Sequence, residues 1–110
     1  MIMALIEPQK LPEVKQALYD IHIHSMTVSS AMGCSQDVGF KEAYRGVEVD
    51  MYLFKKLRLE VAVNDDRAET VIEAICRSAR MDLERNHGMV FVYELVDCVK
   101  VTGERGASIL

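Results

Sequence analysis

The chain has 110 residues, half of them hydrophobic, and its formal net charge is −4. This length favours a single domain over residues 1–110, and the acidic balance argues against nucleic acid as a partner. No apolar run approaches the ~20 residues of a membrane-spanning helix, and Glu7 and Pro8 interrupt the first apolar run too early for a signal peptide. Three cysteines, an odd number without the paired spacing of a zinc site, indicate reduced thiols in a cytoplasmic protein.

The first half of the chain predicts a strand, a helix and a second strand. Residues 1–6 are a short apolar run that ends before Pro8, as in a buried strand. Residues 11–21 carry apolar side chains at the spacing of an amphipathic helix, and Pro12 and Glu13 suit its first turn. Residues 26–32 then predict a strand.

The second half repeats this plan. Residues 57–63 alternate apolar and other residues, which predicts a strand, and Asn64 is a candidate cap for a helix from about Arg67 to about Met81. Residues 88–96 predict a final long strand. The order indicates an α+β fold, a ferredoxin-like βαββαβ sandwich with both helices on one face of the sheet. The other face needs cover, which we expect from oligomerisation.

A long polar connection separates the two halves. It exceeds the ~12–15 residues above which loops in compact domains are usually functional or disordered, so we expect function here. Within it, residues 51–54 are apolar and are equally consistent with a partner-docking anchor and with the start of the next strand.

The chain resembles the PII nitrogen-regulatory signalling proteins over essentially its whole length. The matching residues and segments are Ile6 to Leu11, Met26 to Val28, Gly33, Gly39, Glu42 to Gly46, Lys56, Asp65 and Asp66, Arg77 to Ala79, and Val101 to Glu104.

The resemblance implies a homotrimer that regulates other proteins and is not an enzyme. It implies a protruding T-loop at about 34–55, a B-loop at about 81–89, and an adenine nucleotide (ADP, AMP or ATP) bound between subunits. In the family, 2-oxoglutarate joins through Mg-ATP, and the bound set decides the shape of the T-loop. The T-loop is then expected to dock a membrane transporter or a metabolic enzyme of nitrogen or carbon metabolism.

The sequence departs from the family pattern in the B-loop. Typical members read Thr-Gly-x-x-Gly-Asp-Gly-Lys, a loop whose backbone amides and lysine hold phosphates. Here Gly88 remains and Met89 stands in place of the lysine. Asp82 and Glu84 would repel a triphosphate by about 1 kcal/mol or more per close pair. Weaker or altered binding of an adenine nucleotide, or of another small anion, is therefore expected in place of Mg-ATP with 2-oxoglutarate.

Further departures lie outside the B-loop. The C-terminal arginine pair is reduced to Lys100, with Thr102 at the second position. The glutamine that positions metal and 2-oxoglutarate in the family aligns with Asp37, and Gln36 stands one place early. The tyrosine that some members uridylylate aligns with Val49, with Tyr52 close by.

Residue by residue, the resemblance predicts two groups of functional side chains. The nucleotide or effector site is expected at Thr27, Gly33, Ser35, Gln36, Asp37, Lys56, Glu60, Ala62, Gly88 and Lys100. The T-loop residues expected to dock a target are Tyr44, Arg45, Gly46, Val49 and Tyr52.

Two alternatives remain beside this interpretation. One is a metal-handling trimer similar to CutA, supported by His22, His24 and the cysteines, although solvated turn histidines explain the first two better. The other is a PII-like protein that has lost nucleotide binding and acts by docking alone. Cys34 is either an accessible redox sensor or an ordinary small residue, and Cys76 is expected in the core.

Overall fold

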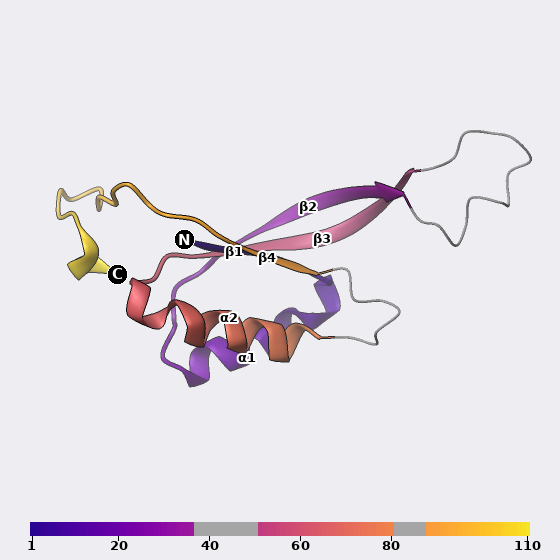
Figure 1. Ribbon diagram of the computed structural model, residues 1–110, viewed down its shortest axis with the longest axis horizontal. Helices are drawn as coiled ribbons and strands as arrows, with labels where there is room; N and C mark the ends of the chain where they lie inside the picture. The colour runs from indigo at the N-terminus through magenta and orange to yellow at the C-terminus, as the bar shows by residue number, and fades with distance from the viewer. Residues whose placement is uncertain (37–50, 81–87) are drawn as a thin grey trace, which may run out of the picture.

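A four-stranded antiparallel sheet carries two helices on one face (Figure 1). The computed structural model describes residues 1–36, 51–80 and 88–110. The elements are β1 (Ile2–Ile6), α1 (Leu11–Asp20), β2 (Thr27–Gln36), β3 (Met51–Val61), α2 (Asp65–Ala79) and β4 (Met89–Val92). The strand order is β2-β3-β1-β4, so the ferredoxin-like fold expected from the sequence is confirmed.

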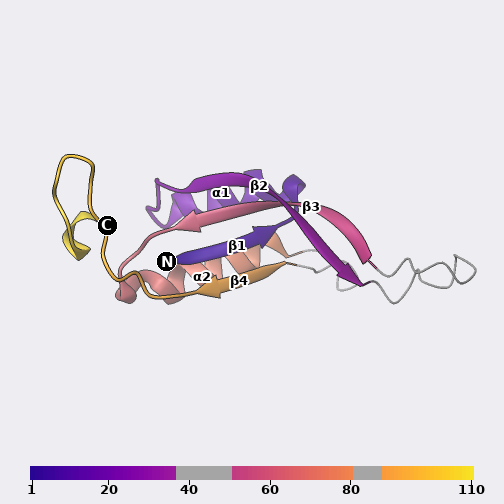
Figure 2. The same ribbon diagram turned by 90° about the horizontal axis from the view of Figure 1, so that it is seen from above.

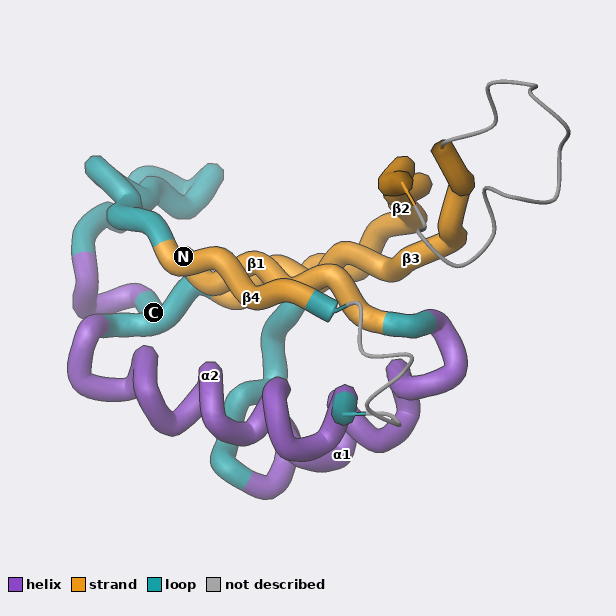
Figure 3. The backbone as a smooth tube through the Cα atoms, turned by 45° about the vertical axis from the view of Figure 1, so that its right-hand side comes forward, coloured by secondary structure: helices purple, strands orange, loops and turns teal. Residues whose placement is uncertain are grey.

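The hydrophobic core lies between the sheet and the two helices. Alternate residues of the central strands face it, because successive side chains of a strand point to opposite faces. The buried core side chains are Ile2, Ala4, Ile6, Val14, Leu18, Leu59, Val61, Val71, Ala74 and Ile75. Figure 3 shows the helices together below the sheet, so the alternate set of strand residues points away from them.

The two helices begin close to the expected positions. A short 3-10 turn, Pro8–Lys10, leads into α1. Helix α2 begins at Asp65 and ends at Ala79, slightly earlier at both ends than the expected 67–81. Asn64 is its N-cap, although its side chain makes no capping hydrogen bond. The Arg67 guanidinium donates to the Ile21 carbonyl and so ties the first turn of α2 to the end of α1.

The hairpin of β2 and β3 extends well beyond the helices (Figure 2). Its register runs without interruption from Thr27 opposite Glu60 to Gln36 opposite Met51. The sequence predicted shorter strands, 26–32 and 57–63, and that prediction was wrong. Along the extension to Gln36 and Met51, the backbone N–H and C=O groups of the two strands pair with each other. This pairing does not require the alternating side chains on which the prediction rested.

The last strand is shorter than expected. It spans Met89–Val92, whereas the sequence predicted residues 88–96. Its partner β1 starts at Ile2, opposite Val92, and one further pair of hydrogen bonds joins Met1 to Tyr93. After Tyr93 the backbone leaves the sheet.

A small hairpin follows β4 near the C-terminus. Val99 pairs with Arg105, and Gly103, at a φ of 112°, makes the turn that glycine adopts most readily. A 3-10 turn, Ala107–Ile109, ends the chain. None of the helices in the described ranges is long and apolar enough to span a membrane.

Candidate functional site

Lys56 is the one polar or charged residue in the buried class among the described side chains, at 5% exposure. It lies in β3 opposite Ala31, between Lys55 and Leu57. Its ammonium donates to the carboxylate of Glu7, the residue that follows β1. A charge excluded from water needs a partner of opposite sign, and Glu7 supplies it here.

The ion pair follows from the register of the two strands. Ile6 faces Leu57 in the β1–β3 ladder, so the next residues along, Glu7 and Lys56, come to lie beside each other. Both side chains fall on the sheet face opposite the core, because they alternate with Ile6 and Leu57. Sequence reasoning singled out Lys56 and missed Glu7, because no local pattern connects them.

Two further residues of the expected nucleotide site, Gly33 and Gly88, lie in the described part of the chain. Gly33, opposite Phe54, lies further along the same hairpin than Lys56. Gly88 precedes β4, and a Cβ placed there would be 3.1 Å from the Leu5 carbonyl oxygen, near the end of β1. A side chain at position 88 would therefore crowd the backbone of β1, which explains why glycine fits here.

The remaining described candidates lie elsewhere. Thr27 faces Glu60 at the start of the β2–β3 ladder, and Ala62 follows β3. Lys100 belongs to the C-terminal hairpin, where its N–H donates to the Glu104 carbonyl. The C-terminal segment lies at the end of the domain away from the tip of β2 and β3 (Figure 2). One chain therefore does not bring the whole expected site together.

Three of the expected residues, Ser35, Gln36 and Tyr52, lie at the far end of the β2–β3 ladder. Ser35 and Tyr52 face each other, and Gln36 faces Met51, so their backbones belong to the hairpin. The residues that lie outside the described ranges are Asp37, Tyr44, Arg45, Gly46 and Val49, together with positions 81–87 of the expected B-loop. Leu53 of the apolar segment 51–54 is paired within β3 and 69% exposed.

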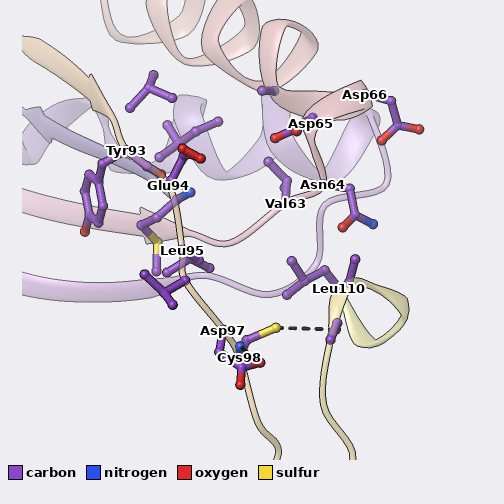
Figure 4. Close-up of a pocket in the computed structure, with 17 residues that line it drawn as sticks. Val63, Asn64, Asp65, Asp66, Tyr93, Glu94, Leu95, Asp97, Cys98 and Leu110 are labelled. Carbon is purple, nitrogen blue, oxygen red and sulfur yellow. Dashed lines mark hydrogen bonds between the residues drawn. The ribbon is translucent and has the colours of Figure 1, made fainter.

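A cleft of about 860 Å³ opens between the first turn of α2, the end of β4 and the C-terminal segment (Figure 4). Asp65, Asp66, Glu94 and Asp97 contribute carboxylates to its lining. None of the residues expected to bind nucleotide lines it, and its acidic rim disfavours phosphate. The cleft is therefore separate from the candidate anion site at Lys56.

The C-terminal hairpin is held by local hydrogen bonds. The Cys98 thiol lies 3.4 Å from the Gly106 carbonyl oxygen. The Thr102 hydroxyl donates to the Glu104 carboxylate and, with a backbone hydrogen bond, lowers the pKa of Glu104. Thr102, at the second basic position of the family pattern, thus interacts with an acid inside its own hairpin.

His22, His24 and Cys76 lie on the surface. His22, at a φ of 68°, and His24 are exposed in the turn after α1, and the His24 ring packs edge-on against Tyr19 at 4.7 Å. Within the described residues, no group of three or more His, Cys, Asp or Glu side chains could hold a metal. The expectation that Cys76 lies in the core is wrong. The buried residues of α2 are Val71, Ala74 and Ile75, and Cys76 is exposed.

Comparison with known proteins identifies relatives over nearly the full chain. The family profile described as "Nitrogen regulatory protein P-II" matches residues 1–105. The chain is 40% identical to "Nitrogen regulatory protein P-II 1" of Methanothermobacter thermautotrophicus, covering 96% of this chain and 91% of that protein. It is 37% identical to "Nitrogen regulatory protein P-II" of Rhodospirillum rubrum, with 97% and 96% covered. It is also 37% identical to "Nitrogen regulatory protein GlnK1" of Methanosarcina mazei, with 96% and 92% covered.

Proposed function

Because the chain belongs to the nitrogen regulatory protein P-II family, we propose that it is a regulatory signalling protein gated by a small anion. The anion binds beside Lys56, and the T-loop at about 34–55 docks a target protein. An adenine nucleotide, ADP, AMP or ATP, is the proposed effector. The family supports the general regulatory role, and the ligand and the target are parts of the proposal.

The position of Lys56 is the observation that carries the proposal. Its ammonium is buried at the base of the β2–β3 hairpin, the element that leads into the T-loop. An anion that binds a buried cation makes charge-assisted hydrogen bonds in a low-dielectric site, which are stronger than those at an open surface. Occupancy at this point therefore acts on the strands from which the docking loop emerges.

The proposed site is completed between subunits of a homotrimer. Lys56 and Gly88 lie toward one end of the sheet, whereas Thr27, Glu60 and Lys100 lie toward the other. Two halves that cannot meet within one chain can meet across a boundary between two chains. The sheet face away from the helices exposes Phe91 and Met89, at 40% and 54%, and offers apolar surface for this contact.

Target docking is assigned to the T-loop residues Tyr44, Arg45, Gly46, Val49 and Tyr52. The hairpin, in which Tyr52 pairs with Ser35, is a stiff support for a docking surface, and a stiff support lowers the ordering cost of binding. The proposed target is a membrane transporter or a metabolic enzyme of nitrogen or carbon metabolism, reached from the cytoplasm.

Calorimetric titration of ADP, ATP and AMP, with and without Mg²⁺ and 2-oxoglutarate, tests the proposal. We expect at least one nucleotide to bind, and Lys56→Met to weaken it by at least about tenfold. The matched control is Lys55→Met, because Lys55 is an exposed neighbour whose side chain falls on the other face of β3. The affinity of Lys55→Met for the nucleotide should stay within about twofold of that of the wild type. A wild-type chain that binds none of the nucleotides would contradict the proposed gating.

A further inference from the structure

We propose that Glu7 is a specificity-determining residue, an internal carboxylate that competes with anionic effectors for the ammonium of Lys56. The inference rests on the proposed function, because it concerns the same anion site. It goes beyond that function in assigning a role to a residue outside the expected site. In this exchange, a phosphate or carboxylate group of the ligand replaces the Glu7 carboxylate as the partner of the Lys56 ammonium.

The two partners of the ion pair differ in their freedom to move. The Lys56 side chain is 6% exposed, and its backbone lies opposite Ala31 of β2, one residue from the last β1–β3 pair, Ile6 and Leu57. The Glu7 side chain is 24% exposed and extends from the junction between β1 and the 3-10 turn. Glu7 can therefore rotate into water, whereas Lys56 cannot follow it.

The backbone of Glu7 does not need to move in this exchange. Its carbonyl accepts a hydrogen bond from the Lys10 N–H at 2.9 Å, and Pro8 follows it in the turn. These constraints fix the main chain and leave the side-chain torsions free. The departure of the carboxylate is thus a rotamer change, which is fast compared with rearrangements of the strands.

The exchange has a consequence for affinity. An anion binds well only to the fraction of molecules in which Glu7 has left Lys56, so the observed affinity is reduced by that fraction. A ligand without negative charge gains nothing from Lys56 and suffers no such reduction. Glu7 therefore sets a threshold that selects ligands whose anionic group interacts with Lys56 more strongly than its own carboxylate does.

Glu7→Gln tests this role, because glutamine keeps the size of the side chain and removes its charge. Three probes are titrated by calorimetry at fixed ionic strength: ADP for phosphate, 2-oxoglutarate for carboxylate, and adenosine as the neutral reference. We expect Glu7→Gln to tighten ADP or 2-oxoglutarate by at least about tenfold and to leave adenosine within about twofold. Which of the two anions gains identifies the effector chemistry.

Glu13→Gln is the matched control. Glu13 pairs with Lys10 at 3.1 Å on the surface, so the same substitution there removes an ion pair and a charge without touching Lys56. Its affinities should equal those of the wild type. If Glu7→Gln binds both anions no more tightly than the wild type, the pair has a structural role alone and the inference is overturned.

A second variant covers the case in which Glu7→Gln does not fold. Glu7→Asp keeps the charge but shortens the side chain, so it weakens the pair and should give a smaller gain in anion affinity. Wild-type affinity of this variant would then overturn the inference. The proposed function fails separately: a wild type that binds no nucleotide contradicts it, yet a gain of binding in Glu7→Gln would still support the internal carboxylate. If neither chain binds an anion, both proposals fail.

Discussion

Lys56 and Glu7 form an ion pair on the sheet face away from the helices, although 49 residues separate them in the chain. The β1–β3 register brings them together one step beyond the pair of Ile6 and Leu57. The contact therefore depends on the sheet rather than on any local motif, and it joins the end of β1 to the base of the hairpin.

Removing the Glu7 carboxylate should reduce the stability of the fold. Glu7→Gln leaves the buried ammonium of Lys56 without its carboxylate, for which we expect a loss of about 1–3 kcal/mol in the free energy of unfolding. Glu13→Gln, which opens an exposed pair, should cost less than about 1 kcal/mol. Urea denaturation of both variants measures the difference, and equal losses would contradict the burial argument.

The sequence predicted the order of the elements because each half carries its own local signal. The apolar spacing of α1, with Pro12 and Glu13 in its first turn, and the alternation of β3 are properties of short windows. The length of β4 is not, because it depends on the pairing of β4 with β1, which is distant in the sequence. The full extent of the β2–β3 hairpin likewise depends on mutual pairing.

The candidate site could be predicted from the sequence to a similar extent. Lys56 and Gly88 stand out through the resemblance to a family, whereas Glu7 acquires its role from a register that appears once the strands are paired. The position of Cys76 is a second feature that the local sequence did not predict correctly. Its spacing fits the apolar stripe of α2, and packing against the sheet and α1 selects Ala74 for the buried edge instead.

Arg67 is expected to stabilise the contact between the two helices. Its guanidinium donates to the Ile21 carbonyl, an acceptor at the C-terminal end of α1. Arg67→Met should lower the free energy of unfolding by about 1–2 kcal/mol, because a partly buried hydrogen bond to a charged donor is lost. Arg77→Met is the control, since Arg77 makes an exposed contact with Glu73 at 3.9 Å and should cost less than about 0.5 kcal/mol. Equal effects in a urea titration would remove the proposed role of Arg67.

The open sheet face should be the surface through which subunits associate. Phe91 faces Met3 in the β1–β4 ladder, on the side away from the core. Phe91→Glu would bury an unpaired carboxylate, at a cost of about 2 kcal/mol or more, and should shift sedimentation toward single chains. Tyr19→Glu, at an exposed position of α1, should sediment as the wild type does. Unchanged sedimentation of Phe91→Glu would place the interface elsewhere.

The acidity of Glu104 reports the Thr102 hydrogen bond. That bond lowers the pKa of Glu104, so Thr102→Val should raise the pKa toward its ordinary value. A lowered pKa contributes stability above the pKa of the unfolded chain, and this contribution is lost as the pH falls through the folded pKa. A carboxyl titration by NMR measures the change, and identical titration curves for variant and wild type would exclude the assigned cause.

Native mass spectrometry in the presence of ADP tests most directly that the effector occupies a site shared between chains. Each chain weighs 12.4 kDa, and we expect a complex of three chains that carries ADP, with the ligand absent from any dissociated chain. A single chain that retains ADP would contradict it, as would a trimer that carries none of ADP, ATP and AMP when each is supplied in turn.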